Sequence, residues 1–422
     1  MRTPLSSGLA AASMGLLLLG LVLRSWQVLL LALPPMIVLA LGSLAPPPRP
    51  RIVALRSLSA DRTDAGREVD VELVVRNEGP SLDLVEIADV LPREFAVLRG
   101  TNHAVVSLEK DGTLRLAYRI RSPVKGDFVL GPVRARSFDP LALGAQDVVL
   151  DVRSPLVVAP AMEDLRRAAL QPRRTRPWFG QVASRRIGPG TEFWGVREYV
   201  AGDEVRRINW KASARLERLF TNEYEGERSG DVLIVVDARR ESSVGTEADN
   251  PVEHAVRAAL GIADRVLATK NRVGLIVYRQ VIDWVPLAFG RKQLYRILDH
   301  LVHVKPGGEW RVSHVGLVLS RFFPRDCLMV LITPLQDRDA LTAVIELAAR
   351  GYDIAIVSPS ALEIERRIRP DTPEDQMAYR ILAMERANRV AQLRRVAQVV
   401  DWDPATPLAL ALRRMTAWPR RA

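Results

Sequence analysis

Residues 190–216 read GTEFWGVREYVAGDEVRRINWKASARL, and the rest of the chain is organised around this stretch. A core strand needs alternation or an apolar run, and a surface helix needs an apolar residue every three or four positions. Neither period is present here. Arginines, carboxylates and amides instead crowd together, and arginine makes paired hydrogen bonds to carboxylates. The stretch predicts a fixed constellation of Arg197, Tyr199, Asp203, Arg206, Asn209, Trp210, Lys211 and Arg215.

The interior of this stretch predicts a turn followed by a short helix. Gly202 suits a turn position with positive φ. A helix over Val205–Leu219 would then take Asp203 as its N-cap. Asp203 is also a natural partner for an arginine, with Arg197, Arg206 and Arg215 as the candidates. Three interpretations stay open: a network that fastens the segment to the following domain, a surface for a partner protein, and a small-anion site.

A catalytic role lacks its usual parts in this stretch. No histidine lies between His103 and His254, and Ser213 has no evident base beside it. Nucleophilic catalysis needs an activating base within hydrogen-bond reach. We therefore predict a non-enzymatic protein with no catalytic residues.

The order G-T-E-F-x-G-x-R-E-Y-x-x-G-D-x-x-R-x-I-N-W-K-A-S-A-R resembles the signature of the bacterial and archaeal domain of unknown function 58 family. The resemblance implies an N-terminal membrane hairpin, a β-rich domain, the signature, and then a von Willebrand factor A-like domain. Family members are typically associated with MoxR-type AAA+ ATPases, which are thought to act as chaperones. The resemblance implies an ATPase partner and no reaction.

Composition is that of a globular protein with a basic surface. The 422 residues suit two or three domains, and the net charge is +11. Such a charge fits an anionic membrane or an acidic protein. Because the chain carries apolar N-terminal runs, we expect membrane lipid or protein as the partner and no nucleic acid. The single cysteine, Cys327, lies in an apolar run, which predicts a buried thiol without a disulfide.

Two apolar runs open the chain, at residues 8–23 and 28–45. Each is near the length that spans a bilayer, and together they predict a transmembrane hairpin within residues 1–48. Pro34-Pro35 would kink the second helix, which is tolerated in a membrane. A cleaved signal peptide is the alternative. The second run and Pro46-Pro47-Pro48, in place of small residues, argue against cleavage.

Basic residues near the ends of the runs predict the orientation. Arg2, Arg49, Arg51 and Arg56 lie on one side, and Arg24 lies in the turn. We expect a multi-pass protein of the cell membrane with two helices and soluble domains in the cytoplasm.

Residues 49–160 alternate in short segments with turns between them. The predicted strands include Val69–Val75, Leu114–Ile120, Asp127–Leu130 and Val148–Val152. Strands at about ten-residue spacing without a helix are typical of an immunoglobulin-like β-sandwich. No catalytic grouping occurs here, so we interpret the domain as a spacer or partner-binding module.

Residues 161–230 hold a basic connector and then the signature. The connector contains Arg166, Arg167, Arg173, Arg174, Arg176, Arg185 and Arg186. A mobile linker is one interpretation, and a docking strip for anionic lipid or an acidic protein is the other. Trp178-Phe179 would anchor such a strip at the headgroup layer.

Residues 231–416 alternate strands with helices, which predicts a mainly parallel, doubly wound α/β sheet. By the resemblance this is the von Willebrand factor A-like domain. The predicted strands are Asp231–Asp237, Val273–Tyr278, Val281–Leu287, Cys327–Thr333, Tyr352–Ser358 and Gln398–Trp402. The predicted helices are Val252–Thr269, Lys292–Val302, Asp337–Arg350, a helix from the cap Thr372 to about Val396, and Pro407–Met415. The helix that begins at Thr372 is predicted to have an apolar face formed by Met377, Ile381, Met384 and Ala391.

That fold often carries a metal site beginning D-x-S-x-S, whose hydroxyl and carboxylate oxygens suit Mg²⁺. Asp237 matches the first position, but Arg239 and Glu241 replace the two serines. We interpret the site as degenerate, without metal, and expect Asp237 to pair with an arginine of the signature, Arg239 or Arg240. The remaining candidates for irregular ligands are Glu241, Ser242, Ser243 and Asp337. No nucleotide-binding loop motif is present, and we expect no cofactor.

These observations favour a membrane-anchored, non-enzymatic adaptor that works with a MoxR-type AAA+ ATPase in chaperone-like assembly. The main alternative is an envelope-organising scaffold without an ATPase partner. A metal-dependent or hydrolytic enzyme and a nucleic-acid binder are further alternatives, and the latter would lose affinity steeply with salt.

Overall fold

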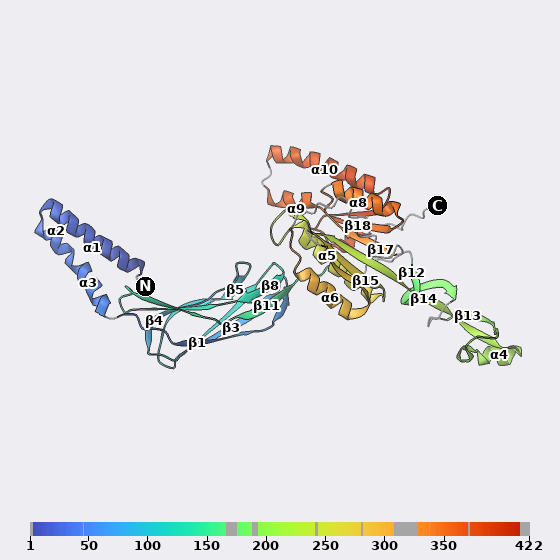
Figure 1. Ribbon diagram of the computed structural model, residues 1–422, viewed down its shortest axis with the longest axis horizontal. Helices are drawn as coiled ribbons and strands as arrows, with labels where there is room; N and C mark the ends of the chain where they lie inside the picture. Colours follow the sequence, from blue (N-terminus) through green and yellow to red (C-terminus); the bar gives the residue numbers. More distant parts are fainter. Residues whose placement is uncertain are drawn as a thin grey trace. The chain divides into compact units, whose positions relative to one another are not determined.

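The structure is a computed structural model, shown in Figure 1, and its chain forms two compact units, residues 1–159 and 160–422. Each unit is described by itself. The residues that the structure describes are 3–44, 46–165, 175–187, 193–240, 244–279, 282–307, 327–336, 338–369 and 372–413.

The first unit begins with an apolar helical hairpin, made of α1 (Pro4–Leu23), α2 (Trp26–Leu31) and α3 (Leu33–Leu44). Two helical stretches, Pro4–Leu23 and Trp26–Leu44, are long and apolar enough to cross a membrane. Arg24 takes φ +48° at the turn between α1 and α2. The predicted kink is present as a break between α2 and α3, because Pro34 cannot donate to the preceding turn.

Short strands follow, arranged in two antiparallel four-stranded sheets and a smaller third sheet in which one pair of strands is parallel. The first sheet has the order β1 (Ile52–Leu58), β3 (Glu68–Asn77), β7 (Thr113–Arg121), β5 (Ala96–Gly100). The second has the order β10 (Ala145–Leu150), β9 (Val133–Phe138), β4 (Leu82–Asp89), β6 (His103–Leu108). The third has the order β2 (Arg62–Asp64), β11 (Ser154–Ala159), β8 (Gly126–Leu130). The four strands predicted from the sequence are confirmed as β3, β7, β8 and β10.

One core lies between the two larger sheets, as a β-sandwich requires. Strand β3 alternates buried and exposed along its length, and its inward side chains include Leu73 and Val75. From the facing sheet, Leu82 and Ile87 of β4 join the same cluster. The alternation of apolar and polar residues along these strands therefore follows from a sheet with one buried face and one solvent-exposed face.

A buried polar cluster sits inside this sandwich, and we call it the sandwich triad: Arg56, Asp89 and Tyr118. The side chains of Arg56 and Asp89 are both 0% exposed. Arg56 donates through Nε to Asp89 Oδ2 over 2.9 Å and through Nη2 to Asp89 Oδ1. Tyr118 donates its hydroxyl to Asp89 Oδ2 over 2.5 Å. Burial, followed by the bond to Asp89, raises the pKa of Tyr118 far above its usual range.

Further bonds from Arg56 close the cluster, because its Nη1 donates to the carbonyl of Leu130 over 2.8 Å and of Val152 over 3.0 Å. Arg56 is therefore an internal side chain of the sandwich and not, as the sequence suggested, a basic residue beside the membrane. Without Arg56, the basic residues on the side of the chain termini are Arg2, Arg49 and Arg51, and the basic residue in the hairpin turn is Arg24.

The second unit is built on one sheet with the order β16 (Ile282–Ala288), β15 (Arg272–Tyr278), β14 (Phe220–Asp237), β17 (Leu328–Ile332), β18 (Asp353–Pro359), β19 (Gln398–Trp402). All neighbours on this path are parallel except β16, which runs antiparallel to β15 at the edge. The mainly parallel sheet is confirmed.

Helices cover both faces of this sheet (Figure 1). The face that carries Ile234 and Val236 packs against α5 (Pro251–Ala268), α6 (Gly290–Val302) and α11 (Leu408–Arg413). The opposite face, with Leu233 and Val235, packs against α8 (Arg338–Ala349) and α10 (Pro373–Leu393). Because successive strand residues point to opposite faces, an unbroken apolar run serves both cores. Cys327 is 1% exposed, which confirms the predicted buried thiol.

Two sequence-based expectations for this unit need correction. A helix that the sequence analysis did not predict, α9, covers Ala361–Ile368. The predicted apolar face of α10 is largely exposed at Met377, Ile381, Met384 and Ala391. Only Val390 and Leu393 are buried in the core, because α10 packs on the sheet through its C-terminal half.

Part of the basic connector forms a strand. Residues Thr175–Ile187 form β12, which pairs with the first half of β14. Arg166, Arg167, Arg173 and Arg174 lie outside the described residues, and so do the side chains of Trp178 and Phe179.

Candidate functional site

The signature forms a small arm on the first half of β14, and we call residues 193–223 the signature arm. Strand β13 (Phe193–Glu198) pairs antiparallel with β14, from Phe193 opposite Tyr224 to Glu198 opposite Phe220. Between the two strands lie a 3-10 turn, Val205–Arg207, and the short helix α4, Trp210–Leu216. Because β14 continues through Asp237 into the central sheet, one strand carries both the arm and the core (Figure 1).

Three charged side chains hold the base of the arm together. Arg197 donates through Nη1 and Nη2 to the carboxylate of Asp203 over 2.8 and 2.6 Å, and through Nε to Glu223 over 2.8 Å. Asp203 also accepts from the backbone N–H of Val200 over 2.9 Å. The Arg197 guanidinium holds the pKa of Asp203 below its usual range. Of the three arginines offered by the sequence, Arg197 is therefore the partner of Asp203.

The predicted helix start was wrong. Asp203 does not cap a helix over Val205–Leu219, because its carboxylate is bound to Arg197 and to the N–H of Val200. The helix begins one turn later, after Asn209, whose Oδ1 accepts from the N–H of Ala212 over 3.0 Å. The Nδ2 of Asn209 donates to Asn222 Oδ1 on β14 over 2.8 Å. Gly202 takes φ +113°, which confirms the predicted turn.

The outer surface of the arm carries the remaining signature residues. Trp210 is 63% exposed, and Lys211 and Arg215 are exposed one turn apart on α4. Among the described residues, no ion pair is formed by Lys211 or Arg215. Arg206 is exposed and pairs with its neighbour Glu204 over 2.6 Å. Tyr199 is half-buried and donates its backbone N–H to Leu219 over 2.8 Å.

The predicted signature residues therefore divide into two groups. Arg197, Asp203 and Asn209 form bonds inside the arm, whereas Trp210, Lys211 and Arg215 face outward. Exposed apolar side chains continue the outward surface at Val200, Val205, Leu216 and Leu219. An exposed aromatic side chain, here Trp210, beside the exposed cations Lys211 and Arg215 is typical of a protein-binding surface.

The second candidate position, Asp237, lies at the carboxyl end of β14. Arg239 donates through Nε to Asp237 Oδ1 and through Nη2 to Oδ2, both over 2.9 Å. Thr333 donates its hydroxyl to Oδ2 over 2.8 Å. The guanidinium of Arg239 also stacks over the ring of Tyr278, 4.9 Å from its centre. Of the predicted partners for Asp237, Arg239 is confirmed, and among the described residues no bond from a signature arginine to Asp237 is seen.

The residues present do not fit a divalent cation at Asp237, because both carboxylate oxygens already accept from a guanidinium. Among the described residues, no group of three or more His, Cys, Asp or Glu could hold a metal ion. The candidates Glu241, Ser242, Ser243 and Asp337 lie outside the described residues.

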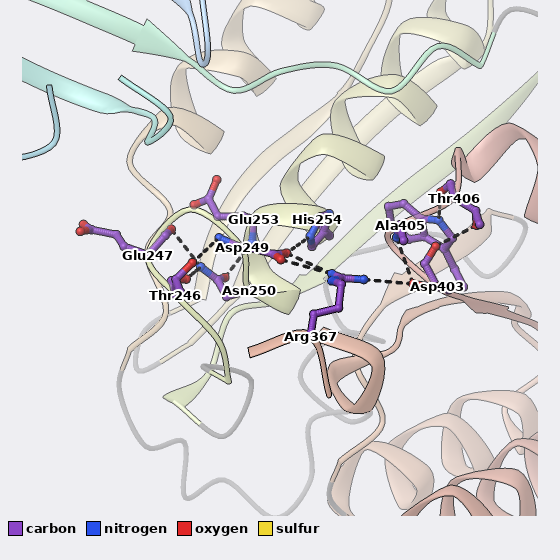
Figure 2. A network of polar contacts seen from close by, with 11 residues as sticks. Thr246, Glu247, Asp249, Asn250, Glu253, His254, Arg367, Asp403, Ala405 and Thr406 are labelled. Atoms are coloured by element: carbon purple, nitrogen blue, oxygen red, sulfur yellow. Dashed lines mark hydrogen bonds and ion pairs between the residues drawn. The ribbon is translucent and has the colours of Figure 1, made fainter. Parts of the chain in front are cut away.

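A further polar network at the carboxyl ends of the strands was missed by the sequence analysis (Figure 2). His254 of α5 bonds through Nε2 to Asp249 over 2.6 Å, and its ring meets Trp402 edge-on at 5.9 Å. Arg367 of α9 joins Asp249 over 3.2 Å and Asp403 over 3.3 Å. The network ties the loop after β14 to α9 and to the end of β19. The bonded pairs are 5, 36 and 118 residues apart in the sequence, so the fold is needed to bring Arg367 to Asp249 and Asp403.

Acid should weaken this network. Burial lowers the pKa of His254, against the opposing effect of its bond to Asp249. The unfolded chain therefore takes up the proton near pH 6.5, before the folded chain does. Stability is fully present above that pH and falls on acidification, by at most about 1.4 kcal/mol per pH unit for one proton.

We expect His254→Gln to flatten the pH dependence of the melting temperature between about pH 7 and 5. Glutamine still donates to Asp249 but does not titrate. His300→Gln is the matched control, since His300 is half-exposed and also bonds a carboxylate, Asp283. An unchanged slope in His254→Gln would contradict the assignment.

Comparisons with known proteins find similarity that spans both the arm and the sheet. A family model described as "Protein of unknown function DUF58" matches residues 195–400, from the arm to the last strand of the sheet. The uncharacterized protein YeaD of Bacillus subtilis (strain 168) is 26% identical over 283 residues, which cover 66% of this chain and 68% of YeaD.

Shorter matches occur to mycobacterial proteins and to solved β-domains. The uncharacterized protein Rv1480 of Mycobacterium tuberculosis (strain ATCC 25618 / H37Rv) is 31% identical over 112 residues, which span 26% of this chain and 35% of Rv1480. The CARDB domain of the PF1109 protein from Pyrococcus furiosus is 12% identical with a TM-score of 0.18, covering 26% of this chain and 89% of that domain. A non-cellulosomal cohesin from Archaeoglobus fulgidus is 12% identical with a TM-score of 0.18, covering 25% and 90%. TM-scores this low do not establish a shared fold.

Proposed function

We propose that the chain is a membrane-anchored, non-enzymatic adaptor that receives a MoxR-type AAA+ ATPase on its signature arm, in chaperone-like assembly. One observation carries the proposal: the internal residues of the arm form its framework, and Trp210, Lys211 and Arg215 are displayed to solvent. The identity of the ATPase rests on the resemblance of the signature to its family. An acidic surface with an aromatic pocket is the partner chemistry that this face fits.

The strand order supports a von Willebrand factor A-like domain. Counted along the chain from the central strand β14, the sheet runs 3-2-1-4-5-6, with its third strand antiparallel at the edge. The preceding domain is taken as immunoglobulin-like on its two antiparallel sheets with one core. Because a fold by itself does not determine a function, the arm and not the two domain folds supports the adaptor role.

The pairing at Asp237 supports a non-enzymatic role for the sheet edge. A carboxylate that is fully bonded to Arg239 and Thr333 is poorly placed to bind a cation or accept a proton from a substrate. The hairpin supports the anchor, and Arg49 and Arg51 against Arg24 favour cytoplasmic soluble domains.

Full-length protein in lipid nanodiscs, mixed with the MoxR-type ATPase of the same organism, tests the proposal. We expect binding that differs between ATP, ADP and no nucleotide. Trp210→Ala should raise Kd about tenfold or more, as expected for an exposed aromatic anchor. Trp284→Ala is the matched control, because Trp284 is a similarly exposed tryptophan of the same unit.

Two results would overturn the proposal. Equal affinity of the Trp210→Ala and Trp284→Ala variants for the ATPase would show that the signature arm does not contact the ATPase. No binding in any nucleotide state would remove the ATPase, and would favour the envelope-organising scaffold in its place.

A further inference from the structure

The end of the sandwich next to the hairpin carries a loop with an unusual construction. Residues Asp139–Gly144, between β9 and β10, are folded around the buried carboxylate of Asp139. Its Oδ1 accepts from the N–H of Leu141 over 2.9 Å and of Leu143 over 3.0 Å, and its Oδ2 accepts from the N–H of Gly144. Ala142 takes φ +54°. This loop has a defined shape and presents Pro140 and Leu141 at its exposed tip.

Both ends of the hairpin contact this loop. At the start of α1, Thr3 donates its N–H to the carbonyl of Leu143 over 3.1 Å and its hydroxyl to that of Ala142 over 2.8 Å. Near the end of α3, Gly42 lies so close to Leu143 that an added Cβ would be 2.5 Å from its Cδ1. The loop is therefore level with the ends of the two apolar helices.

The connection between the helices and the sandwich keeps this end near the bilayer. Only residues 45–51 separate Leu44 of α3 from Ile52 of β1, a reach of about 25 Å when fully extended. Within the connection, the carbonyl of Pro48 accepts from the hydroxyl of Ser137 over 2.5 Å. An added Cβ on Gly144 would be 3.1 Å from Pro47.

Exposed apolar side chains lie at the ends of the hairpin and at the loop tip. Leu5 at the start of α1 and Leu44 at the end of α3 are exposed, and Leu141 is 43% exposed. The basic residues Arg49 and Arg51 lie exposed in the connection. Apolar tips beside arginines are the composition that lies in the lipid headgroup layer.

We propose that the Asp139–Gly144 loop is a membrane-contact site, with Pro140 and Leu141 inserted in the lipid headgroup layer. The loop seats the sandwich on the bilayer, so that the domain is held by its helices and by a second, lipid-bound point. This inference rests on the membrane anchoring in the proposed function and adds the lipid surface as the partner of the sandwich.

Depth-dependent fluorescence quenching tests the inference in the full chain. The one native cysteine, Cys327, is buried, so a cysteine introduced at an exposed position takes the label selectively. Leu141→Cys is compared with Val129→Cys, which is 51% exposed on β8, away from the β9–β10 loop. Met14→Cys in α1 reports on the hairpin, and Pro140→Cys replaces Leu141→Cys if that variant does not fold. Each variant is placed in nanodiscs of phosphatidylethanolamine and phosphatidylglycerol.

We expect headgroup-level nitroxide lipids to quench the Leu141 label several-fold more strongly than the Val129 label. Mid-chain nitroxides should quench the Met14 label most. Equal quenching at Leu141 and Val129, with Met14 quenched, would overturn the membrane-contact site and leave the anchor intact. No quenching at Met14 would overturn the anchor itself, and the inference with it.

Discussion

Asp89→Ala is expected to lower the free energy of unfolding of the sandwich by about 3–5 kcal/mol, because it leaves Arg56 charged and buried without its counter-ion. The other bonds of Arg56 go to two carbonyls and to the Ser154 hydroxyl, which are neutral and do not replace the carboxylate. Tyr118 loses its acceptor in the same change. Native-state hydrogen exchange of β3 and β7 measures the effect locally in the full chain.

Two comparisons make this prediction specific. Asp151→Ala removes an exposed carboxylate that pairs with Arg153 at the surface, and should change stability by about 0.5 kcal/mol or less. Replacing both Arg56 and Asp89 by apolar residues of similar size should cost less than Asp89→Ala alone. If Asp89→Ala is as stable as Asp151→Ala, the sandwich triad does not stabilise the domain as described.

The second large effect is expected at Asp237. Asp237→Ala should destabilise the α/β unit by about 3–5 kcal/mol, because the buried Arg239 then loses the carboxylate that neutralises its charge and Thr333 loses its acceptor. Hydrogen exchange of β14 and β17, the strands that end at this cluster, provides the measurement. Asp283→Ala is the control, because Asp283 is half-exposed and pairs with His300. Asp231 is unsuitable as a control, because it is buried in an ion pair with Arg272.

The alternative for Asp237 is a metal ligand, and it predicts a different pattern. A ligand role would make Mg²⁺ stabilise the wild-type chain, and Asp237→Ala would abolish that gain. We expect the wild-type melting temperature to be the same with Mg²⁺ and with a chelator. Metal-dependent stabilisation that is lost in Asp237→Ala would contradict the role of Arg239 as the permanent partner.

Much of the α/β unit could be predicted from the sequence because its signals are local. Apolar runs such as 231–237 and 273–278 can only be buried strands in a covered sheet, and Thr372-Pro373 begins a helix by its own chemistry. The short helix α9 was missed because Ala361–Ile368 is brief and half of its residues are charged. The first half of β14 was missed because its polar sequence is explained only by pairing with β12 and β13.

The sequence could not predict which residues of the candidate site bond to one another inside the arm and which are exposed. The sequence places Arg197, Arg206 and Arg215 equally well near Asp203, and only the hairpin between β13 and β14 selects Arg197. The same limit explains the sandwich triad, because Arg56 and Asp89 come from strands of different sheets. Pairing across sheets has no local sequence signal.

Charge reversal on α4 tests the central claim most directly. The measurement is the affinity of the full-length chain in nanodiscs for the ATP-bound MoxR-type ATPase. Lys211→Glu/Arg215→Glu is compared with Arg291→Glu/Lys292→Glu, which changes charge equally at exposed positions of α6. We predict that the α4 variant raises Kd about tenfold or more at low salt, with little effect of the α6 variant. Equal affinity of the two variants would contradict the claim that the signature arm receives the ATPase.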